Sequence, residues 1–113
     1  MAHLKYPLLA VAVVLLAGKI SAQSQMQIGK AVFYADKFEG HATASGEIFQ
    51  QDKLTAAHAT LPLNALVEVT NLQNGETITV KVNDRMSYRP ERIIQLSHKA
   101  RRKLHMPDTG VVY

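Results

Sequence analysis

Three polar side chains stand where short predicted strands begin or end: Glu47, His58 and Asp84. Carboxyl and imidazole groups are the side chains that most often transfer protons in catalysis. Glu47 follows the turn Ser45-Gly46, and this position favours a solvated acid. His58 ends a segment of small residues, where a lone histidine is more often a hydrogen-bonded structural residue than a catalyst. Spacing alone therefore leaves the roles of both residues open.

Asp84 attracts attention because of the alternation that precedes it. Ile78, Val80 and Val82 face one side of a predicted strand, and the same parity turns position 84 inward. A lone carboxyl at an apolar rim has a raised pKa and can be kept protonated for use as an acid. The alternative is that the strand ends at Asn83 and that Asp84 is a turn residue. Spacing by itself favours the turn.

No pattern in the chain predicts a metal or cofactor site. His98 and His105 are too far apart along a helix to share a metal ion, and the chain has neither a phosphate loop nor a Gly-x-Ser-x-Gly elbow. The chain has no cysteine, which excludes disulfides, a thiolate metal site, a cysteine nucleophile and a lipid-anchored amino terminus. We therefore expect no cofactor, no metal and no lipid anchor.

The amino terminus has the composition of a secretory signal. Residues 1–6 carry one lysine, Pro7–Gly18 is an apolar run, and Ile20-Ser21-Ala22 ends on a small residue. A membrane anchor is the weaker alternative, because the run has about 12 residues and a span needs about 20. An uncleaved, loosely held terminus is the other alternative. We expect a signal peptide over residues 1–22, a folded domain over 23–113, and export to the periplasm or the exterior.

The charge balance argues against a nucleic-acid partner. The chain has 13 Lys and Arg against 9 Asp and Glu, a formal charge of +4. Without Lys5 and Lys19 of the leader, 11 basic residues face 9 acidic ones, which leaves +2. Much of this excess sits in the cluster 99–103, whereas a nucleic-acid binder of this size spreads more basic charge over one face.

The elements that must position these residues are mostly strands, because the hydrophobic period is two. Asn74-Gly75 between alternating runs predicts a hairpin. Ser97 caps a predicted helix that reaches about His105, with Ala100 and Leu104 on its apolar face. The predicted strands cover Ile28–Ala35, Leu54–His58, Ala65–Leu72, Thr77–Asn83, Ile93–Leu96 and Val111–Tyr113. Six short strands and one helix indicate a small closed barrel, in which few strand edges stay exposed.

Several strings together resemble the rare lipoprotein A (RlpA-like) family. They run in the same order and spacing from about Gly29 to Gly110: Gly29-Lys30-Ala31, Phe33-Tyr34, Phe38-x-Gly40, Thr43-Ala44-Ser45-Gly46-Glu47-x-Phe49, Leu54-Thr55-Ala56-Ala57-His58-x-Thr60-Leu61-Pro62, Val67-x-Val69-Thr70-Asn71-Leu72 and Val82-Asn83-Asp84-Arg85. That family has a double-psi β-barrel related to expansins and barwin. The resemblance implies the same mainly β fold, with six strands and one short helix.

The resemblance also implies a function. Members are lytic transglycosylases that cut the β-1,4 bond between N-acetylmuramic acid and N-acetylglucosamine, with a preference for peptide-stripped peptidoglycan. It implies that Asp84 is the general acid/base, with Glu47 and His58 as further catalytic residues. The implied substrate-binding residues are Tyr34, Thr43, Ser45, Asn83 and Arg85. Peptidoglycan is the implied partner, and cell-division or wall-remodelling proteins are further candidates.

Some residues depart from the family pattern. Met86-Ser87-Tyr88 replaces Gly-Pro-Phe after the Asn-Asp-Arg string, and Gln50 and Gln95 stand where relatives have acids. Asn64 replaces a glycine, and asparagine also accepts a left-handed turn. These changes keep a second hypothesis open: a non-catalytic, expansin-like module that binds glycan or remodels the wall. A secreted protein-interaction module on the same scaffold is a third.

Overall fold

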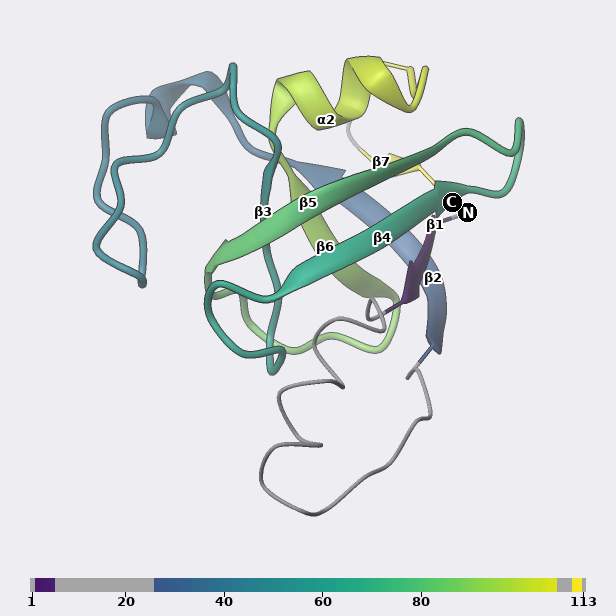
Figure 1. Cartoon of the computed structure of the whole chain (residues 1–113), viewed down its shortest axis with the longest axis horizontal. Helices are drawn as coiled ribbons and strands as arrows, with labels where there is room; N and C mark the ends of the chain where they lie inside the picture. The colour runs from purple at the N-terminus through teal and green to yellow at the C-terminus, as the bar shows by residue number, and fades with distance from the viewer. Residues whose placement is uncertain (1, 6–25, 108–110, 113) are drawn as a thin grey trace.

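The computed structural model describes residues 2–5, 26–107 and 111–112 of the 113-residue chain. Seven strands of this part form one sheet (Figure 1): β1 Ala2–Lys5, β2 Met26–Phe33, β3 Thr55–Ala57, β4 Leu66–Asn71, β5 Thr77–Asp84, β6 Arg92–Leu96 and β7 Val111–Val112. The order β1-β4-β5-β3-β6-β2, together with a β1–β2 pairing, closes six strands into a ring, and β7 adds to β2. The predicted small β-barrel is confirmed, but its sixth strand is β1 and not the predicted last strand, which pairs with β2 outside the ring as β7.

The strand β1 belongs to the segment expected as a leader. It pairs with β2 on one side and with β4 on the other, and Ala2 is buried. Cleavage after Ala22 would therefore remove one strand of the ring. The apolar run and the cleavage region lie outside the described residues. Within the described part, no helix is long and apolar enough to cross a membrane.

The hairpin β4–β5 supplies much of the core. Val67, Val69, Val80 and Val82 are buried, as their alternation predicts. They pack with residues of β2, β3 and β6 and with the helix in one hydrophobic cluster. In the connecting turn Gly75 has φ of 78°, whereas Asn74 does not adopt a positive φ. The turn is therefore a longer loop in which only the glycine needs the left-handed conformation.

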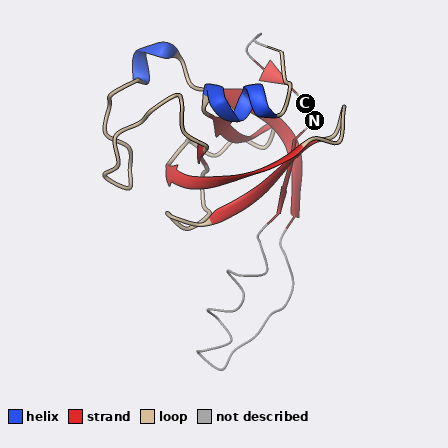
Figure 2. Ribbon diagram, turned by 45° about the horizontal axis from the view of Figure 1, so that its top comes forward, coloured by secondary structure: helices blue, strands red, loops and turns tan. Residues whose placement is uncertain are grey.

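One α-helix, α2 His98–Lys103, lies across one end of the barrel (Figures 1 and 2). The Ser97 side chain accepts a hydrogen bond from the Ala100 backbone N–H, as expected for an N-cap. Ala100 and Leu104 are buried against the core. The helix ends two residues earlier than expected, because His105 adopts a φ of 52°.

Two backbone positions explain motif residues. A Cβ at Gly29 of β2 would lie 2.8 Å from Cγ2 of the Ile93 side chain, so a larger residue there would have to displace that side chain. Asn64 has φ of 73°, which confirms that it takes the left-handed turn. The connection from β2 to β3 contains the 3-10 turn η1 Asp36–Phe38 and extends from one side of the barrel (Figures 1 and 2). This long connection carries Glu47.

Candidate active site

The end of β5 carries a local irregularity that turns its last side chains. Ala56 of β3 pairs with Val82, and Ala57 pairs with Asp84, so that Asn83 is an extra residue. Such a bulge breaks the alternation and re-aims side chains. Asn83 is consequently buried directly after buried Val82, and Asp84 is half-buried within the strand. The strand includes Asp84, and the alternative in which it ends at Asn83 is wrong.

The Asp84 carboxyl group has three hydrogen-bond donors around it. The Tyr34 hydroxyl donates to Oδ2 at 2.6 Å. The backbone N–H groups of Ala44 and Arg85 both donate to Oδ1 at 2.9 Å. The expected lone carboxyl at an apolar rim is therefore wrong, since backbone and phenol donors from three segments hold this group in one orientation.

Tyr34 is fixed by the packing of its ring. It is only 5% exposed, and the ring stacks on Phe49 with centroids 4.0 Å apart and an interplanar angle of 21°. Burial raises the pKa of the Tyr34 phenol well above its ordinary value, and the hydrogen bond to Asp84 and that residue's charge add to the rise. The phenol keeps its proton and acts as a donor to Asp84.

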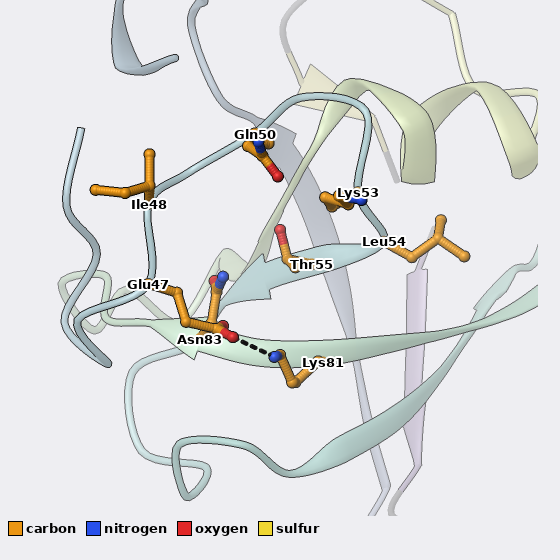
Figure 3. Close-up of a pocket in the computed structure, with 8 residues that line it drawn as sticks. All are labelled: Glu47, Ile48, Gln50, Lys53, Leu54, Thr55, Lys81 and Asn83. Carbon is orange, nitrogen blue, oxygen red and sulfur yellow. Dashed lines mark hydrogen bonds and ion pairs between the residues drawn. The ribbon is translucent and has the colours of Figure 1, made fainter. Parts of the chain in front are cut away.

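Glu47 is held by its own turn and by β5. The Thr43 N–H and hydroxyl donate to the Glu47 carbonyl at 2.8 and 2.7 Å. The Ser45 N–H donates to the Asn83 carbonyl at 3.0 Å, which attaches the turn to the bulge. The Glu47 side chain forms an ion pair with Lys81 of 2.5 Å between Oε2 and Nζ (Figure 3).

The charge state of Glu47 follows from these neighbours. The hydrogen bond from Lys81 lowers the pKa of Glu47 below its ordinary 4.5, and the Asn83 amide acts in the same direction. The carboxyl group is nearly half exposed, so the ion pair itself adds little to fold stability. Its consequence is a permanent anion at neutral pH on the rim of a cleft.

This cleft has a volume of about 570 Å³. It is lined by residues of the 47–54 connection, β3 and β5: Glu47, Ile48, Gln50, Lys53, Leu54, Thr55, Lys81 and Asn83 (Figure 3). Thr55 Oγ1 and Asn83 Oδ1 are buried and have no hydrogen-bond partner within the described part of the chain. A buried polar atom without a partner costs about 1–3 kcal/mol. Asp84 is not a lining residue but directly follows Asn83.

His58 lies in a different environment. Its Nδ1 accepts the N–H groups of Thr60 and Leu61 at 3.1 and 3.0 Å, so the ring proton is on Nε2, which donates to Gln27 Oε1 at 2.9 Å. Burial, and then the Arg85 guanidinium, lowers the pKa of His58 below its ordinary 6.5. The ring is neutral and fully paired, and it is absent from the lining of the Glu47 cleft. A catalytic role for His58 stays a prediction.

The remaining predicted substrate-binding residues mostly contact the protein itself. Arg85 Nη1 donates to the carbonyls of His58 and Leu61 at 3.3 and 2.6 Å, which ties that segment to the end of β5. Thr43 and Ser45 share a hydrogen bond of 3.0 Å within the turn that presents Glu47. Substrate binding by these side chains stays a prediction.

Two contributors to the site were missed at the level of sequence. Lys81 alternates with the inward Val80 and Val82 on β5, so the pattern predicts an outward side chain, and the structure pairs it with Glu47. Lys81 and Glu47 are 34 residues apart, and no local spacing in the sequence indicates their contact. The hydrogen bond from the Ala44 N–H to Asp84 could not be predicted from the sequence, because almost any residue supplies a backbone N–H donor. Among the described residues no group of three or more His, Asp or Glu side chains could hold a metal ion.

A family profile described as Lytic transglycolase matches residues 26–113. The chain belongs to this family. It is 46% identical over 89 residues to "Endolytic peptidoglycan transglycosylase RlpA" of Pseudomonas aeruginosa, a match that covers 79% of this chain and 26% of the relative. It is 49% identical over 90 residues to the protein of the same name from Yersinia pestis, covering 80% and 25%. The chain thus spans about a quarter of the length of these curated relatives.

Membership of the lytic transglycolase family confirms the resemblance drawn from the motifs, and it agrees with the double-psi β-barrel expected for this ring of strands. The matched region includes every residue of the Asp84 and Glu47 groups. Treponema pallidum has a further relative, "Probable endolytic peptidoglycan transglycosylase RlpA", that is 48% identical over 83 residues, covering 74% of this chain and 26% of the relative.

Proposed function

We propose that this chain is a lytic transglycosylase that cuts the β-1,4 bond between N-acetylmuramic acid and N-acetylglucosamine in peptide-stripped peptidoglycan strands. The family and the names of the relatives support this proposal. The observation that carries it is the arrangement of two acids, Asp84 and Glu47, at the end of β5. Asp84 is oriented by three donors, and it adjoins a cleft whose rim holds the ionised Glu47.

Asp84 is the general acid and base of the proposed reaction. The cycle requires Asp84 to enter in its protonated form. It then gives this proton to the glycosidic oxygen, and the bond from the anomeric carbon to that oxygen breaks, with its electron pair leaving on the oxygen. The C6 hydroxyl of the same muramic acid then attacks the anomeric carbon and returns a proton to Asp84. No water is consumed, and the product has a 1,6-anhydro ring. One acid/base group is enough, unlike the carboxyl pair of a hydrolase.

Glu47 is the electrostatic partner in this proposal. Its pKa lies below the ordinary 4.5 because of Lys81 and Asn83, so Glu47 is an anion at neutral pH and can stabilise the positive charge that develops at the anomeric carbon. A protonated carboxyl group could not do this. The two acids therefore divide the work: Asp84 transfers the proton, and Glu47 stays charged throughout.

The place of action follows from the substrate. Peptidoglycan lies outside the cytoplasmic membrane, and the composition of residues 1–22 supports export by a signal peptide. Cleavage after Ala22 would remove β1 and leave the ring open between β2 and β4. We place the protein in the periplasm or outside the cell, with glycan strands as partner and cell-division or wall-remodelling proteins as candidates for its recruitment.

The decisive experiment is mass spectrometry of glycan strands, with and without stem peptides, after incubation with the protein. We expect products ending in 1,6-anhydro-N-acetylmuramic acid, and a loss of about 10²–10⁴-fold in their rate of formation in Asp84→Asn. Asp36→Asn is the matched control, because that side chain is 90% exposed in η1. Reducing ends would indicate a hydrolase. Strands bound but uncut would indicate the expansin-like binding module, for which Gln50 in the cleft is the specific observation.

A further inference from the structure

The cleft beside Glu47 has two unpaired polar atoms at its floor. Thr55, on β3, and Asn83, in the bulge of β5, are 7% and 2% exposed. Neither Thr55 Oγ1 nor Asn83 Oδ1 has a hydrogen-bond partner in the part of the chain that the structure describes. Figure 3 shows both side chains pointing toward the loop from Glu47 to Lys53. Proteins normally pair such atoms, so an unpaired couple in a cleft indicates groups kept for a ligand.

The hydrogen-bonding character of the two atoms can be deduced. Asn83 Oδ1 is the carbonyl oxygen of an amide, so it can only accept a hydrogen bond and needs a donor. The Thr55 hydroxyl can donate to an acceptor of the ligand. The floor thus offers one acceptor and one donor.

We propose that this floor is a subsite for the acetamido group of an N-acetylated amino sugar. A secondary amide presents one N–H and one C=O, which complement Asn83 Oδ1 and Thr55 Oγ1. Ile48, which is 55% exposed, and Leu54 line the same cleft and offer apolar contact to the acetyl methyl group. This inference rests on the proposed function, because it names the part of the glycan that the cleft beside Glu47 recognises.

The charges of the cleft add a reason to reject the deacetylated sugar. Lys53 and Lys81 both line the cleft, and Glu47 is the one acid among the lining residues. Lys53 makes no ion pair within the described residues, so the lining carries a net positive charge. A free amino sugar is partly protonated at neutral pH and then carries a positive charge. In this cleft the free amino sugar lacks the acetamido C=O and N–H that match Thr55 and Asn83, and its positive charge is repelled by the net positive charge of the lining.

The test measures binding of two soluble hexamers to the whole protein, N-acetylglucosamine hexamer and glucosamine hexamer, by isothermal titration calorimetry. We expect the acetylated hexamer to bind more tightly. In Thr55→Val its affinity falls about tenfold, the size of one lost hydrogen bond, whereas binding of glucosamine hexamer stays the same. The melting temperature of Thr55→Val equals or exceeds that of the parent, because an unpaired buried hydroxyl is replaced by a methyl group.

Two further variants keep this result interpretable. Thr55→Ser retains the hydroxyl and keeps the affinity for the acetylated hexamer. Thr79→Val changes an exposed threonine of β5 outside the cleft lining and leaves binding unchanged.

Three results would overturn the subsite. Equal affinity of the parent for both hexamers would remove the acetamido group as the ligand. Unchanged binding by Thr55→Val would remove the role of the hydroxyl. Competition between a soluble stem peptide and the acetylated hexamer would assign the amide to the peptide. Because binding is measured without cleavage, a failure of the subsite is distinct from a failure of the proposed reaction, which would show as missing 1,6-anhydro products.

Discussion

The end of β5 and the segment from His58 to Leu61 are neighbours that use their polar groups in opposite ways. Around Glu47 and Asn83 a half-exposed ion pair and two unpaired buried atoms border an open cleft. In the other segment both nitrogens of the His58 ring are paired, and Arg85 binds the backbone carbonyls.

This difference distinguishes Glu47 from His58, to which the family resemblance gives the same catalytic role. A group whose hydrogen-bonding capacity is used up inside the protein holds structure together, whereas a charged or unpaired group beside a cleft remains available to a ligand. Glu47 is a group of the second kind, and the two paired ring nitrogens of His58 are groups of the first. Asp84 lies between them, with both carboxyl oxygens bonded but with its side chain half-buried rather than enclosed.

The largest effect expected from this comparison is on activity. Glu47→Gln removes the anion and should reduce the formation of 1,6-anhydro ends by about 10²-fold or more. In His58→Asn the new amide oxygen can still accept the N–H groups of Thr60 and Leu61, as in an Asx turn, so the loss should stay within about fivefold. Mass spectrometry of released strands measures both rates. If His58→Asn is as slow as Glu47→Gln, the His58 ring takes part in the reaction, and the difference drawn between the two residues is wrong.

A smaller effect concerns the pH dependence of activity. Lys81 lowers the pKa of Glu47, so Lys81→Met should move the acidic limb of the rate profile to higher pH, because Glu47 then takes up its proton earlier as the pH falls. Lys81→Arg keeps the positive charge and should restore the parent profile. Rates measured between about pH 4 and pH 7 test this. An acidic limb that stays in place would show that ionised Glu47 is not required.

The smallest effect is on stability and arises from His58. Its pKa in the folded protein lies below the ordinary 6.5 of the unfolded chain. As the pH falls below about 6.5 the unfolded chain takes up a proton that the folded ring refuses, so the free energy of unfolding decreases, by at most about 1.4 kcal/mol per pH unit. The decrease ends once the folded ring is itself protonated.

Urea unfolding at a series of pH values measures this decrease. His58→Asn, which has no titrating group at this position, should lose less stability than the parent over the same range. Equal pH dependence in the two proteins would show that His58 is not the neutral, buried ring described above.

The sequence predicted the fold well because its signals are local. Alternation of Val67, Val69, Val80 and Val82 needs only a two-sided sheet, and Ser97 needs only the backbone of its own helix to act as a cap. The hairpin was predicted by Asn74-Gly75, although only the glycine adopts positive φ. The motif strings were long enough to predict the family.

The site was only partly predictable. The sequence determined which acids and which histidine the chain offers, and the alternation along β5 singled out Asp84. The expectation that its carboxyl group would stand alone at an apolar rim was wrong, because three donors bond to it. Only the tertiary structure decided that β5 would bulge at Asn83 against β3, that Lys81 would pair with Glu47, and that Nε2 of His58 would bond to Gln27. These contacts join residues far apart in the chain. The positions of these side chains depend on how the strands of the ring pair and where a β-bulge interrupts the pairing, and no local spacing in the sequence encodes this.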